Sequence, residues 1–253
     1  MNEMILMPLP HYGFDPTEAA VPWKYLAERG VKIVFATPDG KPAATDERLI
    51  TGKGFGPFKK FLMATPEAIA AYREMFRSSA FQQPIQYASI ATEKYTAILL
   101  PGGHDKGMKT YLESSILQTK VAEFFTSQKL VGAICHGTVL AARATDPQTK
   151  HSVLYEYQTT ALLKNQEMEA YYLTALWLKD YYRTYPVTVE AEVKSVLKSP
   201  EQFHTGSFSV KRDSETDESP ALVVEDRNYL SARWPGDAHT FAKKFFQRLQ
   251  EME

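Results

Sequence analysis

Apolar and polar positions alternate in blocks along the chain, and the blocks predict alternating strands and helices. Residues Met4–Leu9 are almost all apolar, which is typical of a short buried strand. Asp15, Pro16 and Glu18 then form a helix start, in which Asp15 caps the first turn and Glu18 completes a capping box. Apolar residues follow at helical spacing, and the β-branched run 31–38 (VKIVFATP) predicts a central parallel strand. This order is that of a βαβ unit.

The same alternation continues toward the C-terminus. Residues 95–103 (YTAILLPGG) predict a strand that ends in a glycine turn, and residues 109–129 predict one amphipathic helix. The apolar run 130–137 (LVGAICHG) predicts a strand that passes directly into a helix. Residues 221–226 (ALVVED) predict a further strand, and residues 235–249 predict a helix with one aromatic face.

We therefore expect an α/β fold, a three-layer sandwich of a mostly parallel sheet with helices on both faces, as in flavodoxin-like proteins. A single domain is expected over residues 1–253. Segments 52–85 and 155–204 interrupt the alternation and are interpreted as helical insertions packed over an edge or end of the sheet. The Tyr and Trp residues of 155–204 suit either plain packing or a substrate wall. The charged segment 211–220 (KRDSETDESP) predicts an exposed loop.

Composition narrows the class of protein. The chain has 29 Lys+Arg against 30 Asp+Glu and a net charge of -1, which argues against a nucleic-acid partner and against an anionic membrane surface. Its 44% hydrophobic and 23% charged residues are ordinary for a soluble globular protein. The single cysteine excludes an intramolecular disulfide and gives no support for secretion. The first ten residues resemble neither a signal peptide nor a membrane span, so we expect a cytoplasmic protein.

Two frequent kinds of ligand site are not supported. The glycine-rich run 52–60 (GKGFGPFKK) lacks the spacing of a Walker loop, and no dinucleotide fingerprint follows a strand. The six histidines are scattered, and one cysteine cannot build a structural zinc site. We therefore expect no metal and no cofactor.

The strongest chemical signal is the segment 133–138 (AICHGT). Cys135 lies where an apolar strand passes into a helix, and a side chain at such an elbow projects above the carboxyl end of the sheet. The N–H groups and dipole of the helix are expected to lower the thiol pKa. His136 is expected to exchange protons near neutral pH. A buried, inert cysteine is the alternative.

A neighbouring turn, 101–104 (PGGH), ends a strand at the same edge of the predicted sheet. The backbone N–H of Gly103, helped by that of His136, is the natural donor to an oxyanion that forms during attack by the thiolate. We accordingly expect Gly102, Gly103 and His104 to bind substrate. An ordinary strand-to-helix turn also explains the glycines, and the two interpretations are compatible.

Four segments together resemble one family, in order and in spacing. They are 13–40 (GFDPTEAAVPWKYLAERGVKIVFATPDG), 99–108 (LLPGGHDKGM), 131–137 (VGAICHG) and 227–242 (RNYLSARWPGDAHTFA). The chain resembles the ThiJ/PfpI superfamily within the class I glutamine amidotransferase-like fold. Its long insertions are similar to those of the larger branch, which holds heat-inducible chaperones and glutathione-independent glyoxalases (glyoxalase III).

The resemblance implies roles for particular residues. Cys135 matches the elbow nucleophile, and His136 matches the histidine that follows it. Glu18 matches a glutamate that hydrogen-bonds the sulfur, a role that predicts partial burial and a raised pKa instead of a capping box. Many members have an Asp or Glu that orients the histidine. In this chain Lys164 lies near the position expected for that acid. Glu167 is the nearest downstream carboxylate and a possible third acid, an exposed helix-start residue being the alternative.

The resemblance also implies a function. We expect a cysteine-dependent enzyme that acts on small reactive carbonyls without an external cofactor, converting methylglyoxal to lactate as a hydro-lyase, or a related deglycase. A homodimer is expected on the same ground. An amidase or peptidase-type hydrolase is an alternative, although 237–240 (DAHT) lacks the His-x-Glu pair of glutaminases. A non-enzymatic stress protein, either a redox sensor through Cys135 or a holdase chaperone, is another.

Overall fold

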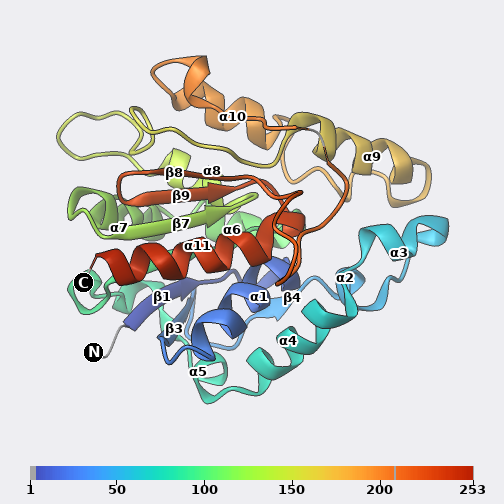
Figure 1. The fold of residues 1–253 in the computed structure, drawn as a ribbon, viewed down its shortest axis with the longest axis horizontal. Helices are drawn as coiled ribbons and strands as arrows, with labels where there is room; N and C mark the ends of the chain where they lie inside the picture. The colour runs from blue at the N-terminus through green and yellow to red at the C-terminus, as the bar shows by residue number, and fades with distance from the viewer. Residues whose placement is uncertain (1–3, 208, 253) are drawn as a thin grey trace.

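A seven-stranded sheet forms the centre of the protein in the computed structural model, which describes residues 4–207 and 209–252. The strand order is β5-β3-β1-β6-β7-β9-β8, and only β8 runs antiparallel to its neighbour (Figure 1). The strands are β1 (Met4–Pro8), β3 (Lys32–Thr37), β5 (Ile85–Gln86), β6 (Ala97–Leu100), β7 (Leu130–Ile134), β8 (Val223–Asp226) and β9 (Tyr229–Ala232). A separate parallel pair joins β2 (Tyr12–Phe14) to β4 (Ala44–Thr45).

Helices cover both faces of the sheet. On one face α1 (Pro16–Ala27) and α11 (Ala238–Glu251) lie side by side, with α4 (Pro66–Arg77) against α1. The other face carries α6 (Lys109–Leu112), α7 (Ser115–Thr126) and α8 (Gly137–Arg143), and the short helices are α2 (Glu47–Thr51), α3 (Lys59–Leu62) and α5 (Ser79–Gln82). The predicted mostly parallel sheet flanked by helices is confirmed. Within the described residues, none of the helices has the length and apolar character that crossing a bilayer requires.

Every residue of β6 and β7 is buried, because neighbouring strands and both helical layers enclose them. Their runs are accordingly apolar without alternation, as expected for central parallel strands. The chain leaves β1 toward β3 and β5, and returns to place β6 on the other side of β1. Such a reversal opens a crevice at the carboxyl ends of the strands, where α/β proteins place their ligands.

The two segments interpreted as insertions pack against each other. Residues 155–204 contain α9 (Lys164–Leu178) and α10 (Val189–Val196), and α10 packs against α8. Residues 52–85 contain α3, α4 and α5. A small apolar cluster around Phe55 and Tyr182 joins α9 to α2 and α3. Helices α3 and α9 lie to one side of the central sheet (Figure 1).

Two elements differ from the sequence-based expectation. The prediction of a single helix over 109–129 is wrong. The backbone of Ser114 is extended, and its Oγ caps a new helix by accepting a hydrogen bond from the N–H of Leu117 at 3.3 Å. The strand β9, which pairs in parallel with β7, has no counterpart among the predicted strands. Its four residues, YLSA, are too few and too mixed to form a recognisable apolar run.

The loop 211–220 is not uniformly exposed, in contrast to the expectation from its charged sequence. Asp213 is buried, and its carboxylate accepts the backbone N–H groups of His239 at 3.3 Å and Thr240 at 2.7 Å. These are first-turn N–H groups of α11 without partners inside the helix, so the loop caps the helix. Arg212 consequently faces inward.

Candidate active site

Cys135 occupies a tight turn between β7 and α8. Its φ of 57° is left-handed, a conformation that side chains with a Cβ rarely adopt. Two hydrogen bonds hold the turn: the N–H of Cys135 donates to Ala232 O at 3.1 Å, and its carbonyl accepts from Thr138 Oγ1 at 2.6 Å. The side chain is only 5% exposed and lines a cavity. The elbow geometry expected from the sequence is therefore present.

Two glycines allow other backbone segments to approach this turn closely. A Cβ on Gly137 would lie 2.0 Å from the carbonyl oxygen of Leu100, at the end of β6. A Cβ on Gly102 would lie 2.6 Å from the backbone nitrogen of His136 and 2.7 Å from Glu18 Oε2. Any larger residue would push these groups apart.

Glu18 is directed at the turn and not at its own helix terminus. Its Oε2 accepts the N–H of Gly102 at 2.9 Å, and its carboxyl group hydrogen-bonds the side chain of Cys135. The backbone N–H of Asp15, which a capping box would use, donates instead to Gly102 O at 2.9 Å. The capping-box interpretation of Glu18 is therefore wrong. Asp15 caps α1 by accepting the N–H of Thr17 at 2.7 Å.

His136 is held between the thiol and a threonine. Its Nδ1 lies 3.5 Å from Cys135 Sγ, and its Nε2 lies 3.2 Å from Thr184 Oγ1. The Thr184 hydroxyl donates its proton to the carbonyl of His104 at 2.6 Å, so it accepts from His136 Nε2–H. His136 Nδ1 then carries the lone pair and accepts a hydrogen bond from the thiol. Thr184 lies in the connection between α9 and α10, and nothing in the sequence pattern identifies it.

Glu167 does not take the place of the acid that orients His136. Its carboxylate accepts from Arg183 Nη1 at 2.8 Å and from the backbone N–H of Val189 at 2.9 Å. These contacts tie α9 to the start of α10, and Glu167 lines the cavity with one edge. The hydroxyl of Thr184 occupies the position expected for a carboxylate.

Burial dominates the protonation of the three central groups. It raises the pKa of Cys135 well above 9.0, and the charge of Glu18 raises that pKa further. Burial and then the charge of Asp15 raise the pKa of Glu18, in agreement with the expectation. Burial lowers the pKa of His136 to about 3, so its imidazole is neutral at pH 7. The expected low thiol pKa and near-neutral histidine pKa are wrong, because the dipole of the seven-residue α8 does not offset burial.

Gly103 and His104 form the wall beside the thiol. Gly103 lines the cavity and has a φ of 148°. The His104 ring stacks on Tyr182 with 4.4 Å between centroids and meets Tyr181 edge-on at 4.7 Å. Burial lowers the pKa of His104 to about 4. The role of the Gly103 N–H as an oxyanion donor stays a prediction.

A cavity of about 110 Å³ lies above the sulfur. Its lining includes Glu18, Gly103 and Cys135 on the side of the sheet, and residues of α3 and α9 from the inserted segments on the other side. Trp234 also lines it, and of the aromatic residues in segment 155–204 the lining includes Tyr182; whether Tyr182 contacts substrate stays a prediction. A cavity of this volume has room for several water molecules and therefore for a small organic molecule.

Three potential metal ligands lie together outside the cavity lining. Ligand atoms of Glu67, Glu215 and His239 are within 4.8 Å of one another, and both carboxylates are exposed. Exposed acidic groups often cluster without binding an ion. The grouping joins three distant segments, so the sequence shows only scattered residues.

Comparisons with known proteins identify the family and the fold of this chain. The sequence model of a family described as ThiJ/PfpI family-like matches residues 9–190. An uncharacterized protein of Schizosaccharomyces pombe is 26% identical over 145 residues, which cover 54% of this chain and 52% of that protein. A glutathione-independent glyoxalase of the same yeast is 24% identical over 159 residues, covering 61% of this chain and 62% of the enzyme. The matches thus span between half and two thirds of these relatives.

A solved structure shows the same fold along the whole chain. The glyoxalase III of Candida albicans superimposes with a TM-score of 0.66 at 17% identity, covering 97% of this chain and 96% of that one. Identity at this level shows the fold alone. The family model, in contrast, covers well over half of the 253 residues. On this ground the chain belongs to the ThiJ/PfpI-like family.

Proposed function

We propose that the protein is a glutathione-independent glyoxalase that converts small 2-oxo aldehydes such as methylglyoxal into 2-hydroxy acids. One observation carries the proposal: the Glu18 carboxyl group and the lone pair of His136 Nδ1 both face the sulfur of Cys135, at the floor of a small, partly enclosed cavity. A nucleophile, a proton carrier and limited access to water are what the reaction needs.

The chemistry follows from the groups present. The Cys135 sulfur adds to the aldehyde carbon, and the carbonyl oxygen takes a proton to give a hemithioacetal. Removal of the hydrogen on that carbon, with protonation of the neighbouring carbon through an enediol, gives a 2-hydroxy thioester. Water then cleaves the thioester and returns a proton to the sulfur. One carbon is oxidised while its neighbour is reduced, so the sum is one aldehyde and one water per hydroxy acid.

Glu18 is the best candidate for moving these protons. Burial raises its pKa, so it holds a proton to higher pH than a free carboxyl group and can exchange that proton with the sulfur that it contacts. His136, with a pKa of about 3, is a poor proton store and instead orients the thiol through Nδ1. The glyoxalase among the relatives supports the substrate class, and the cavity volume supports a molecule of this size.

Incubation of the purified protein with methylglyoxal in glutathione-free buffer is expected to yield lactate. An enzymatic lactate assay with chiral analysis measures it, because spontaneous hydration and rearrangement give racemic product slowly. Addition of glutathione should not raise the rate, because the thiol of Cys135 replaces that of glutathione and free glutathione only removes aldehyde as its own hemithioacetal. A failure to form lactate above the buffer blank contradicts the proposal.

Replacement of Glu18 by glutamine is expected to change the pH profile of Cys135 alkylation by iodoacetamide. In the native protein two acids in contact lose their protons in two coupled steps, so the rate should rise in two steps, the upper above pH 9.0. In Glu18→Gln only the thiol titrates. Because the charge of Glu18 raises the thiol pKa, the single remaining step should lie below the upper step of the native protein.

The exposed Glu28, at the other end of the same helix, provides the matched control. Glu28→Gln should keep the two-step profile. A native profile with one step, unchanged in Glu18→Gln, would show that the two groups do not share protons.

A further inference from the structure

Several buried polar atoms of the cavity lining have no hydrogen-bond partner among the described residues, and two of these atoms can only donate. These two donors are Arg212 Nη1 and Trp234 Nε1, and both side chains line the cavity that contains Cys135. A guanidinium and an indole N–H can only donate hydrogen bonds. Because buried donors are nearly always paired, an occupant of this cavity is expected to supply acceptor oxygens at this wall.

The guanidinium of Arg212 is fixed along one edge and unpaired at the other. Its Nη2 donates to the carbonyls of Phe61 at 3.3 Å and Met63 at 3.4 Å. The guanidinium carbon lies 5.5 Å from the centroid of the Trp234 ring, so the two side chains belong to the same part of the cavity wall. The free edge is therefore held in place before any ligand arrives, which favours binding of a planar, two-oxygen group.

The charge of Arg212 is only partly compensated by its surroundings. The acidic groups that act on it are Asp15, Glu18 and Asp213, and none of the ion pairs among the described residues includes Arg212. The Glu18 carboxyl group hydrogen-bonds the side chain of Cys135, and burial raises the pKa of Glu18. Asp15 and Asp213 are each engaged by two backbone N–H groups at helix starts. A negative charge on the ligand would neutralise the remaining positive charge of the Arg212 guanidinium.

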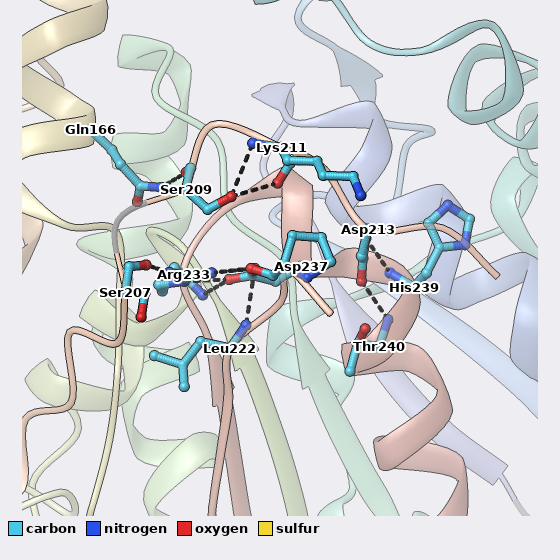
Figure 2. A network of polar contacts seen from close by, with 11 residues as sticks. Gln166, Ser207, Ser209, Lys211, Asp213, Leu222, Arg233, Asp237, His239 and Thr240 are labelled. Atoms are coloured by element: carbon cyan, nitrogen blue, oxygen red, sulfur yellow. Dashed lines mark hydrogen bonds and ion pairs between the residues drawn. The ribbon is translucent and has the colours of Figure 1, made fainter. Parts of the chain in front are cut away.

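The segment that carries Arg212 is pinned on both sides (Figure 2). Downstream, Asp213 caps α11. Upstream, the buried Arg233 donates to Ser207 O at 3.0 Å and pairs with Asp237 at 2.9 Å, while Gln166 Nε2 donates to Ser209 O at 3.4 Å. Arg212 is thus not a loose surface side chain, and its position follows from the fold.

We propose that Arg212 and Trp234 form a carboxylate-binding subsite beside Cys135, and that the physiological substrate is a small carbonyl compound that also carries a carboxylate. The two carboxylate oxygens match the two unpaired donors, and the anion neutralises the guanidinium. The inference that the substrate is a carbonyl compound rests on the proposed function. Methylglyoxal is then an analogue of the physiological substrate that lacks the carboxylate. Binding of a carboxylate at Arg212 and Trp234 can be tested without measuring catalytic activity.

The test compares two alkylating reagents of similar shape, anionic iodoacetate and neutral iodoacetamide. Both react with the same thiolate, so the ratio of their rates cancels the thiol pKa and reports the environment of the cavity. We expect the ratio in the native protein to exceed that of the urea-unfolded chain by about tenfold, since a charge-assisted pair of hydrogen bonds forms only with iodoacetate. Arg212→Met should return the ratio to the unfolded value.

Arg73, exposed on α4, provides the matched control, and Arg73→Met should keep the native ratio. An Arg212→Met ratio equal to the native one overturns the subsite. A second measurement needs no variant: acetate should slow alkylation of the native protein by iodoacetamide at constant ionic strength, whereas acetamide should not. Equal effects of acetate and acetamide also overturn it.

The two proposals fail in different ways. A native protein that forms no lactate but shows the elevated reagent ratio refutes the glyoxalase and supports the subsite. A protein that forms lactate but treats both reagents alike refutes the subsite and supports the glyoxalase.

Discussion

Exchange of Cys135 for serine is expected to lower the rate of lactate formation from methylglyoxal by about 10³-fold or more. Serine keeps the shape of the side chain and can occupy the same left-handed turn at a φ of 57°. Its hydroxyl ionises far less readily than a thiol and is a poorer nucleophile in the absence of a strong base. His136, with its pKa of about 3, does not supply such a base.

The comparison requires that both proteins be folded. Thermal unfolding of Cys135→Ser should fall within a few degrees of the native protein, because an oxygen in place of the sulfur still faces Glu18 and His136. Steady-state rates are then measured over the same range of methylglyoxal concentration. A variant that retains a substantial part of the native rate would place the chemistry elsewhere in the molecule.

Exchange of Gly137 for alanine is expected to lower the free energy of unfolding by at least about 3 kcal/mol. The new Cβ would lie 2.0 Å from the carbonyl oxygen of Leu100, which is backbone in the central strand β6 and cannot rotate away. Relief requires α8 to shift, and Cys135 moves with it. Urea unfolding monitored by circular dichroism measures the loss.

Gly30 gives the matched control, because a Cβ added there would meet no atom within 4 Å and only its φ of +81° opposes alanine. Gly30→Ala should lower the free energy of unfolding by about 1 kcal/mol. Equal losses in the two variants would show that α8 tolerates displacement from β6.

The architecture can be predicted because its signals are local. The apolar runs of β1, β3, β6 and β7 reflect burial on both faces, and Asp15 and Pro16 mark the start of α1 within a few residues. The misses are local as well. Ser114 sits in a helical pattern although a serine in that place can cap a new helix, and β9 is too short to show a pattern.

In the candidate site, too, some residues can be predicted from local sequence and others cannot. Cys135 and His136 can be identified from a six-residue segment, because an elbow is encoded by its own neighbours. Thr184 is 48 residues from His136, and Arg212 reaches the cavity only because Asp213 caps a helix near the C-terminus. The predicted direction of the thiol pKa is wrong for a related reason. The position of Cys135 at the start of a helix can be inferred from neighbouring residues. Its burial depends on the packing of segments that are distant in sequence, so it cannot be inferred in this way.

The enclosure of Cys135 also bears on how the protein would respond to oxidants. Peroxide is small enough to reach the sulfur and convert it to a sulfenic acid, but the 253 residues contain no second cysteine to form a resolving disulfide. The side chain of Cys135 is only 5% exposed, which disfavours attack by a bulky thiol on a sulfenic acid at this position. Oxidation at this position is therefore expected to proceed toward the irreversible sulfinic state, so the architecture suits a catalyst that peroxide inactivates better than a reversible sensor.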